Sequence, residues 1–164
     1  MSGSDETAIW VREACLDDFP KLLPVFEEGD RFHREALPWM FQNARGAFPT
    51  EEYIAGLISR EDVGLLVAEH EDELIGSVTV RLLQSPEFPL LVPRRYASVD
   101  TLVVVPEWRK RGVASRMMEA CEEWARRQGA TYIELVVYEF NEGAKALYRG
   151  LGYETLSRRL SKPL

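Results

Sequence analysis

The sequence predicts a three-layer α/β/α domain, an α/β fold in which a central mixed sheet lies between two layers of helices. Segments of strand and helix character follow one another in the order β, α, α, β, β, β, α, β, α, β. The strand-like runs at 63–69 and 73–83 are separated by three polar residues, as in an antiparallel hairpin. A helical segment over 113–129 lies between two later strands and favours a parallel pair. A sheet with both kinds of pairing is mixed.

The first part of the chain is expected to hold one strand and several helical segments. Alternating side chains predict a strand over 7–13. Asp17 is the expected N-cap of the next helix, which should be kinked at Pro24. A separate short helical piece is expected over 31–41, and Thr50 can cap a further helix. All of these segments precede the hairpin that opens the main sheet.

The second half of the chain alternates strands and helices. A strand over 97–105 leads to the helix over 113–129, whose apolar residues fall on one face. A strand is expected over 131–138, then a helix capped by Asn141, and a last strand over 153–160. In such sheets ligands gather at the carboxyl ends of parallel strands where the strand order switches. The end of the strand over 97–105 is therefore the first place to look for a site.

Length and composition describe one compact domain and exclude several classes of protein. With 164 residues, of which 46% are hydrophobic, the chain can fold without a disulfide or metal. Cys15 and Cys121 lie far apart with no C-x-x-C motif, which argues against a zinc site and fits a reducing cytoplasm. No apolar run approaches the roughly 18 residues that cross a bilayer. Residues 1–6 do not resemble a signal peptide and are interpreted as a frayed end or a remnant of cloning, which leaves 7–164 as a single domain.

A short basic segment interrupts an otherwise acidic chain. The net charge is −7, but residues 106–116 carry +3, so the other 153 residues carry −10. That balance argues against a nucleic-acid binder. The basic segment joins a strand to a helix, and Gly112 and Ala114 keep side chains away from the free N–H groups of the first helical turn. A phosphate ligand is expected here, although a solvated turn could carry the same charges. No Walker or G-x-G-x-x-G motif is present.

Two motifs in this region resemble those of the GNAT superfamily of N-acetyltransferases. The first, Arg109-x-x-Gly112-x-Ala114, follows a hydrophobic strand and is similar to the family's acyl-CoA motif. The second begins about 27 residues later and reads Asn141-x-x-Ala144-x-x-Leu147-Tyr148-x-x-x-Gly152-Tyr153. The hexapeptide alone is weak, but both motifs in order form a specific match, and the resemblance covers essentially the whole chain. It implies the acyl-CoA N-acyltransferase fold, with acetyl-CoA as cosubstrate and no metal.

The resemblance implies that residues of both motifs bind CoA. The pyrophosphate would lie on the amides and basic side chains of the turn and helix start, which are Arg109, Lys110, Arg111, Gly112, Val113, Ala114 and Ser115. The pantetheine arm would pair with a bulged strand, where an amide stabilises the oxyanion, and the matching positions are Leu102, Val103 and Val104. From the second motif, Asn141 and Ala144 would also contact CoA. Asn141 is expected to be an N-cap as well.

Proton transfer would depend on two residues. Tyr148 is the implied general acid that protonates the leaving thiolate, and a core aromatic at helical spacing is the competing interpretation. An amine must lose a proton before it attacks. Asp100 is the candidate to accept it, because Asp100 precedes Leu102 on the strand beside the acetyl group; pairing with a cation or exposure to solvent are the alternatives. Glu134, Glu139 and a chain of waters are weaker candidates.

The family's acceptor pocket is formed by the first two helices and nearby loops. Here the segment 30–41 mixes acidic, imidazole and aromatic side chains, which would suit an amine. Phe32, His33 and Asp100 are the expected substrate contacts, although His33 could instead be a surface or capping group. Cys15 has no base motif beside it, so a covalent acyl-cysteine route finds no support.

The sequence therefore predicts a cytoplasmic enzyme that moves the acetyl group from acetyl-CoA directly to an amine. A CoA-binding sensor or interaction module without catalysis is the alternative. No nucleic acid or membrane partner is expected. A homodimer is left open, since many members of the family are dimers, and the sequence does not specify the acceptor amine.

Overall fold

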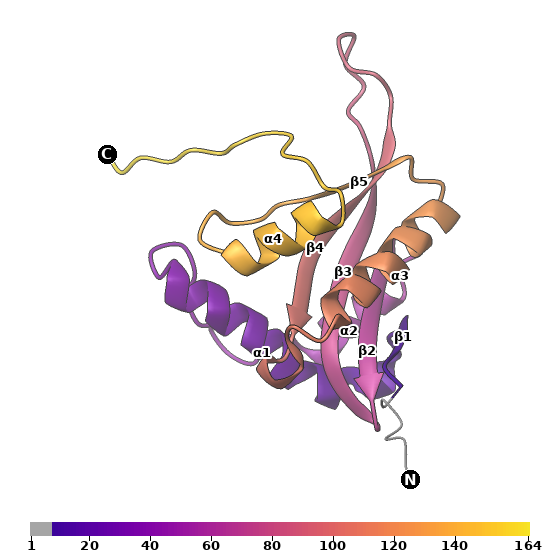
Figure 1. Cartoon of the computed structure of the whole chain (residues 1–164), viewed down its shortest axis with the longest axis vertical. Helices are drawn as coiled ribbons and strands as arrows, with labels where there is room; N and C mark the ends of the chain where they lie inside the picture. Colours follow the sequence, from indigo (N-terminus) through magenta and orange to yellow (C-terminus); the bar gives the residue numbers. More distant parts are fainter. Residues whose placement is uncertain (1–7) are drawn as a thin grey trace.

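The computed structural model describes residues 8–164 as a five-stranded sheet covered by helices on both faces (Figure 1). The strands are β1 (Trp10–Glu13), β2 (Val63–His70), β3 (Glu73–Gln84), β4 (Arg95–Val104) and β5 (Tyr132–Leu135). The helices are α1 (Phe19–Ala36), α2 (Glu51–Ile58), α3 (Val113–Arg127) and α4 (Glu142–Gly150), with short 3₁₀ turns η1 (Leu16–Asp18) and η2 (Pro106–Trp108). The predicted α/β/α fold class is confirmed. The strand start at Thr7 and the interpretation of residues 1–6 lie outside the described residues.

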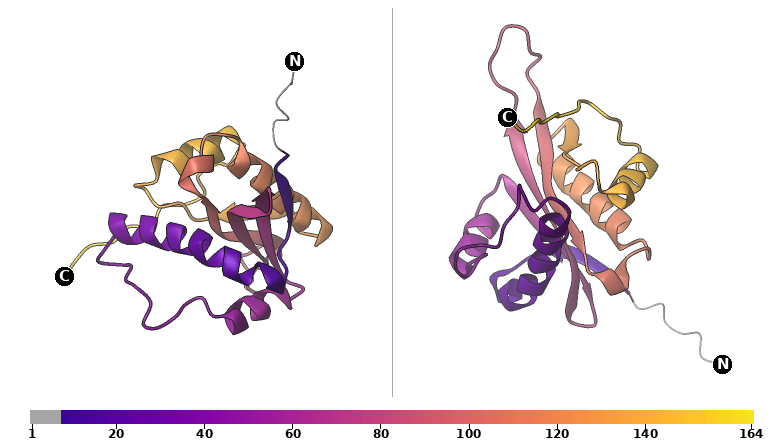
Figure 2. Two further views of the ribbon diagram at one scale, coloured as in Figure 1. Left: turned by 90° about the horizontal axis from the view of Figure 1, so that it is seen from below. Right: turned by 90° about the vertical axis from the view of Figure 1, so that its left-hand side faces the viewer.

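Side chains that alternate along the strands build one core on each face of the sheet. On β2, Leu65 and Val67 pack toward α1 and α2, whereas the intervening Leu66 and Ala68 belong to the core under α3. The apolar face of α3 is buried as its spacing predicts. Helix α4 packs on the same side as α3, through Tyr148. The two views in Figure 2 show α1 and α2 on one side of the sheet and α3 and α4 on the other.

The sheet has the mixed pairing that the sequence predicts. Strands β1 to β4 pair antiparallel in chain order, and β5 pairs parallel to β4 at the end of the sheet. The register between β3 and β4 shifts once: Thr79 lies opposite Thr101, but Val80 lies opposite Val99. Asp100 is therefore the extra residue of a β-bulge.

The N-terminal helices differ from the expectation in two ways. Residues 31–41 are not a separate helix, because α1 runs without a break through Pro24 to Ala36 and ends just before Pro38. The N-cap position of α1 is Asp18 rather than Asp17, since the carboxylate of Asp18 is held by Arg12 and by the amide of Cys15, and a 3₁₀ turn precedes the helix. The cap at Thr50 is confirmed, with its Oγ1 accepting from the amide of Tyr53 at 3.1 Å.

The C-terminal strands also differ. Strand β5 ends at Leu135 instead of residue 138, because pairing with β4 stops at the Val99–Leu135 pair, one residue before the bulge. The expected strand over 153–160 is wrong: residues 153–164 are irregular, and no strand within residues 8–164 pairs with them. Within the described residues, none of the helices is both long enough and apolar enough to cross a membrane.

Candidate active site

A gap opens in the sheet where β4 outlasts β5. Strand β4 continues to Val104, but its pairing with β5 stops at Val99. Over 101–104 one edge of β4 pairs with β3, and the opposite edge has no strand partner in the described part of the chain. This edge includes the sequence-predicted Leu102, Val103 and Val104. An extended ligand can bind to such an edge by backbone hydrogen bonds.

The β-bulge lies just before these residues, not among them. The resemblance associated a bulge with the positions of Leu102, Val103 and Val104, whereas the register places the extra residue at Asp100. A bulge increases the local twist and interrupts the ladder. It therefore marks the point where β4 and β5 separate.

The start of α3 presents free amides beside the end of β4. The N-cap is Gly112, at φ 78°, and no side chain caps the helix. The first bond of α3 runs from the amide of Arg116 to the carbonyl of Gly112 at 3.1 Å, so the amides of Val113, Ala114 and Ser115 have no backbone acceptor in the described residues. A positive φ favours glycine, and the region around its Cα is open. Uncapped amides at the positive end of a helix dipole bind anions.

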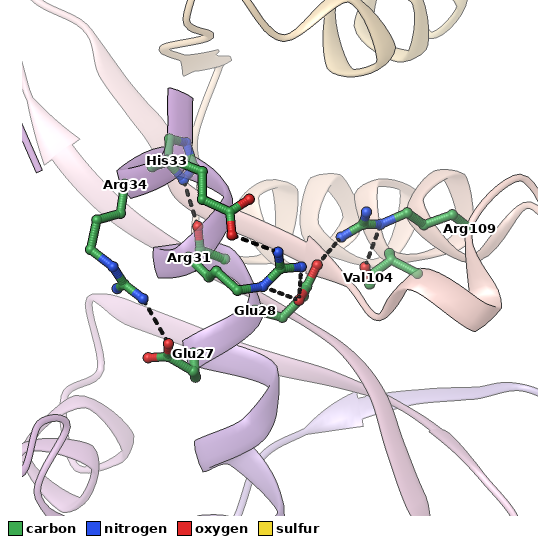
Figure 3. Close-up of polar contacts among 9 residues, drawn as sticks. Glu27, Glu28, Arg31, His33, Arg34, Val104 and Arg109 are labelled. Carbon is green, nitrogen blue, oxygen red and sulfur yellow. Dashed lines mark hydrogen bonds and ion pairs between the residues drawn. The ribbon is translucent and has the colours of Figure 1, made fainter. Parts of the chain in front are cut away.

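The basic side chains around this turn are not equally available. Figure 3 shows Arg109 directed at Glu28 of α1, with an ion pair of 2.7 Å, while its Nε donates to the carbonyl of Val104 at 3.0 Å. Burial of Glu28 raises its pKa, but hydrogen bonds from Arg31 and Arg109 outweigh that effect and leave the pKa below its usual range. The guanidinium of Arg111 lies 5.1 Å from the ring centre of Trp108. Arg109 thus links β4 to α1.

The second motif is held at its start by the expected helix cap. The Oδ1 of Asn141 accepts from the amide of Ala144 at 3.0 Å, which confirms the N-cap. Further along the helix, Tyr148 packs against the core under α3 and against the ring of Tyr153, with ring centres 5.7 Å apart. Burial, with a smaller contribution from Cys121, raises the pKa of Tyr148 to about 12. Its phenol therefore carries its proton at neutral pH.

A cavity of about 580 Å³ lies between α1, the loop after it and β4. It contains the predicted His33 and Asp100, whereas Phe32 is not in its lining. Phe32 lies behind His33, with ring centres 5.8 Å apart, and 5.9 Å from the guanidinium of Arg109. The predicted segment 30–41 also contributes Asp30, Arg34 and Phe41 to the lining. Residues of the lining outside that segment that the sequence analysis did not name include Glu27, Phe48 and Tyr138.

His33 has a fixed orientation within this cavity. Its Nδ1 lies 2.8 Å from the carbonyl oxygen of Gly29, one turn earlier in α1. A carbonyl only accepts, so Nδ1 carries the hydrogen and, in the neutral ring, Nε2 keeps a lone pair. The rings of Phe41 and Tyr138 lie 5.4 and 5.5 Å from the imidazole. His33 is thus a potential proton acceptor in an aromatic surrounding.

The carboxylates of the cavity differ in their partners. Asp100 is held by Arg81 through two hydrogen bonds, of 2.5 and 2.9 Å. Glu27 pairs with Arg34 at 2.8 Å, as Figure 3 shows. Asp30 forms no ion pair or hydrogen bond in the described residues. Burial and the charge of Glu27 raise its pKa above the usual value. A lining that is rich in carboxylates favours a cationic ligand.

The remaining candidates are engaged elsewhere. Glu134 pairs with Arg94 at 2.7 Å, and Glu139 pairs with Lys145 at 3.0 Å, which lowers the pKa of Glu139. Cys121 is a core residue as expected, and burial raises the pKa of its thiol to about 12. Neither glutamate lies in the lining of the cavity.

Comparison with known proteins identifies the family. The model of the Acetyltransferase (GNAT) family matches residues 29–153, a span that includes both motifs and every residue of the gap in the sheet. The chain belongs to the GNAT family. A curated relative, the uncharacterized N-acetyltransferase YhfO of Bacillus subtilis, is 27% identical over 144 residues, covering 88% of this chain and 89% of the relative. An uncharacterized N-acetyltransferase of Archaeoglobus fulgidus is 26% identical over 138 residues, covering 84% of this chain and 88% of the relative.

Solved structures share the GNAT fold of this chain. A mutant of the BH1408 protein from Bacillus halodurans has a TM-score of 0.88 at 23% identity, covering 94% of this chain and 99% of that one. The aminoglycoside N-acetyltransferase AAC(6')-Iy, solved in complex with CoA, has a TM-score of 0.77 at 12% identity and covers 99% of both chains. At these identities the likeness shows the fold alone. The gap between β4 and β5 and the uncapped start of α3 therefore lie within a chain that has the GNAT fold.

Proposed function

We propose that this GNAT protein is an N-acetyltransferase that moves the acetyl group of acetyl-CoA directly to an amine. The observation that carries the proposal is the meeting of two backbone features at one place. The free edge of β4 ends at Val104, and the free amides of α3 begin at Val113. The edge of β4 suits an extended arm that carries amides, and the amides of α3 suit a pyrophosphate. CoA contains both groups in one molecule.

The residues of the chain would divide the work of binding acetyl-CoA. The amides of Val113, Ala114 and Ser115 are free to donate to phosphate oxygens, with Lys110 and Arg111 adding positive charge. The edge of β4 over 102–104 would hold the pantetheine arm and direct an amide at the thioester carbonyl. Acetyl-CoA supplies the acetyl group, and CoA leaves as the free thiol.

Tyr148 is the proposed general acid. Its raised pKa keeps the phenol protonated, so it can donate to the thiolate as the carbon–sulfur bond breaks and the new carbon–nitrogen bond forms. The contacts of its ring with the core and Tyr153 fix its orientation. The amine proton must leave in the other direction, toward the acceptor cavity.

Asp100 and His33 are the two proposed groups on the amine side. Asp100 borders both the gap and the cavity, which supports a role for it beside the reacting amine. Its two oxygens are occupied by Arg81, which favours orienting the amine over taking its proton. The Nε2 of His33 is the alternative acceptor, since Nδ1 is committed to the carbonyl of Gly29. The other carboxylates of the cavity would attract an acceptor amine that carries positive charge.

A binding titration and a turnover assay test the proposal. We expect calorimetry to detect both acetyl-CoA and CoA, and a thiol-release assay across amine classes to identify an acceptor. Tyr148→Phe should lower turnover by about 10²- to 10⁴-fold with little change in acetyl-CoA affinity. Tyr153→Phe is the matched control, because its hydroxyl bonds Glu122 at 3.1 Å and is given no catalytic role.

Each other outcome has a distinct meaning. Absence of acetyl-CoA binding would refute the proposal as a whole. Binding without release from any amine would favour the alternative function, a CoA-binding sensor or interaction module. Full turnover of Tyr148→Phe would remove the phenol from the mechanism and leave the transfer itself intact. A cytoplasmic location stays a prediction from the two free thiols.

A further inference from the structure

The side chain of Arg111 contacts an aromatic ring rather than a carboxylate. Its guanidinium lies 5.1 Å from the ring centre of Trp108. Within residues 8–164 it forms no ion pair, whereas the neighbouring Arg109 is paired with Glu28. The face of an indole attracts a guanidinium, and this contact favours a few of the many rotamers that an arginine can adopt. Arg111 is therefore a partly ordered cation that can still take an anion.

Trp108 is fixed by parts of the fold that lie outside the basic segment. It is the last residue of η2, which lies between the end of β4 and the start of α3. Its half-buried ring packs against the core under α3. The imidazole of His70, the last residue of β2, lies beside it, with ring centres 4.4 Å apart and planes tilted by 45°. The indole thus rests on both the core and the end of β2.

His70 contributes a ring to this contact and not a hydrogen bond. Its Nε2 is buried and has no hydrogen-bond partner in the described part of the chain. A buried polar atom without a partner lowers stability, so hydrogen bonding does not explain a histidine at this position. The flat surface of the ring against Trp108 does explain it.

The backbone that follows Trp108 adopts an uncommon conformation. Lys110 has a φ of 59°, in the left-handed region that residues with a side chain rarely adopt. Such a conformation persists where the surrounding contacts fix it. Trp108 supplies contacts on one side of the turn, and the ion pair of Arg109 with Glu28 supplies another. Arg111 follows directly, so the position of Trp108 affects both where its side chain begins and what it packs on.

We propose that Trp108, seated against His70, is a positioning residue that holds the guanidinium of Arg111 ready for a phosphate group of acetyl-CoA. This role rests on the proposed function and extends it to two residues to which the motifs assign no part. A long side chain that is already ordered loses less conformational entropy when it binds an anion. A guanidinium also pairs with phosphate oxygens through a fixed fork of N–H donors, which needs a defined orientation. The free amides of α3 remain the main anion site, so the effect should be modest.

Calorimetric titration of acetyl-CoA into Trp108→Leu tests the proposal. Leucine keeps an apolar contact with the core but has no ring for the guanidinium. We expect the Kd for acetyl-CoA to rise about 2- to 10-fold, with a matching rise in KM and a kcat close to that of the wild type. Trp108→Phe keeps a ring and should recover most of the affinity. Trp10→Leu, at a tryptophan of β1 that is 68% exposed, is the matched control and should bind acetyl-CoA as the wild type does.

A double-mutant cycle shows whether Trp108 acts through Arg111. Arg111→Gln should weaken acetyl-CoA binding, and adding Trp108→Leu to that variant should have little further effect. Arg127→Gln removes the same charge from the opposite end of α3 and serves as the control. S-acetylpantetheine lacks the pyrophosphate and the adenosine, so its KM should be the same for Trp108→Leu and the wild type. A merely structural role of Trp108 would raise both KM values.

Two substitutions of His70 test the second ring. His70→Phe keeps a ring beside Trp108 and removes the unpartnered Nε2, so it should retain both the affinity for acetyl-CoA and the stability in urea. His70→Ala should weaken acetyl-CoA binding, and only while Arg111 is present.

The contrary outcomes are distinct. The proposal is overturned if Trp108→Leu binds acetyl-CoA as tightly as the wild type, if the losses from Trp108→Leu and Arg111→Gln add, or if S-acetylpantetheine is affected equally. A wild-type protein that does not bind acetyl-CoA would refute the proposed function, and the role of Trp108 with it.

Discussion

Replacing Gly29 with alanine should disturb the contact between α1 and β4 that positions the acceptor side of the site. A Cβ at this position would lie 2.6 Å from Cγ2 of Val103. The helix or the valine must therefore move, and overpacking of this kind costs about 1 to 3 kcal/mol. Alanine is about 1 kcal/mol better than glycine inside a helix. We expect Gly29→Ala to lower the free energy of unfolding by a net amount of roughly 0 to 2 kcal/mol.

A double-mutant cycle isolates the steric part. Val103→Ala removes both γ-carbons and should by itself cost about 2 kcal/mol, from two lost methyl groups and the space they leave. In the double variant the new Cβ of residue 29 has room, so the loss should be smaller than the sum of the two single losses by about 1 to 3 kcal/mol. Urea unfolding followed by circular dichroism measures all four corners of the cycle.

Gly56 gives the matched control, because it is also inside a helix but has nothing within 4 Å of the position that a Cβ would occupy. Gly56→Ala should raise the free energy of unfolding by up to about 1 kcal/mol. The reasoning fails if Gly29→Ala stabilises the protein as much as Gly56→Ala does. It also fails if the losses from Gly29→Ala and Val103→Ala simply add.

Three further predictions concern the site and the pH dependence of stability. Gly112→Glu should abolish acetyl-CoA binding in calorimetry, because it places a carboxylate beside the free amides. It also requires a residue with a side chain to adopt a φ of 78°, which favours glycine. Asp18→Asn should lower the free energy of unfolding by about 2 kcal/mol at neutral pH, because hydrogen bonds from Arg12 lower the pKa of Asp18 from 3.8 to about 2. In the wild type this stabilisation is complete above about pH 4 and is lost as the pH falls through 2. Acid unfolding curves of the variant should lack this pH-dependent loss. His33→Gln should lower kcat, whereas Asp100→Asn should mainly raise KM for the amine and leave kcat closer to that of the wild type.

Contrary results would be equally clear. If Gly112→Glu binds acetyl-CoA as tightly as the wild type, the start of α3 is not part of the acetyl-CoA site. Parallel acid unfolding curves for the wild type and Asp18→Asn would show that the ion pair does not stabilise the fold. If kcat falls in Asp100→Asn and is kept in His33→Gln, the aspartate is the proton acceptor.

The parts of the fold that the sequence predicted well are those in which local pattern and tertiary packing agree. The hairpin of β2 and β3 and the helix α3 show this, since their apolar spacing matches the faces that are buried. Two segments broke the agreement. Prolines suggested breaks between residues 24 and 38, but packing of Leu22 and Val25 under the sheet holds α1 together as one helix. Residues 153–160 were expected to form a strand, but in the described part of the chain no strand pairs with them.

The candidate site divides in the same way. The CoA side could be predicted because it depends on backbone features that are encoded within a few residues, such as Gly112 and the cap at Asn141. The acceptor side could be predicted only in part: the expected segment 30–41 lines the cavity through Asp30, His33 and Phe41. Glu27, Phe48 and Tyr138 come from other parts of the chain and meet that segment only through packing. The sequence signal for this side was the mixture of acidic and aromatic side chains over 30–41. That mixture does not show which of these side chains line the same cavity.

The ion pair of Arg109 and Glu28 explains why the backbone, and not the side chains, should dominate anion binding here. The basic segment has three consecutive cations, but the guanidinium of Arg109 is already paired with a carboxylate from α1 and with the carbonyl that ends β4. That pairing joins the helix that carries His33 to the strand that carries the free edge, so it couples the two sides of the site. It also leaves Lys110 and Arg111 as the other two of the three consecutive cations. Because amides carry no charge to be screened, an anion held mainly by them should bind with a weaker dependence on salt than one held by three free cations.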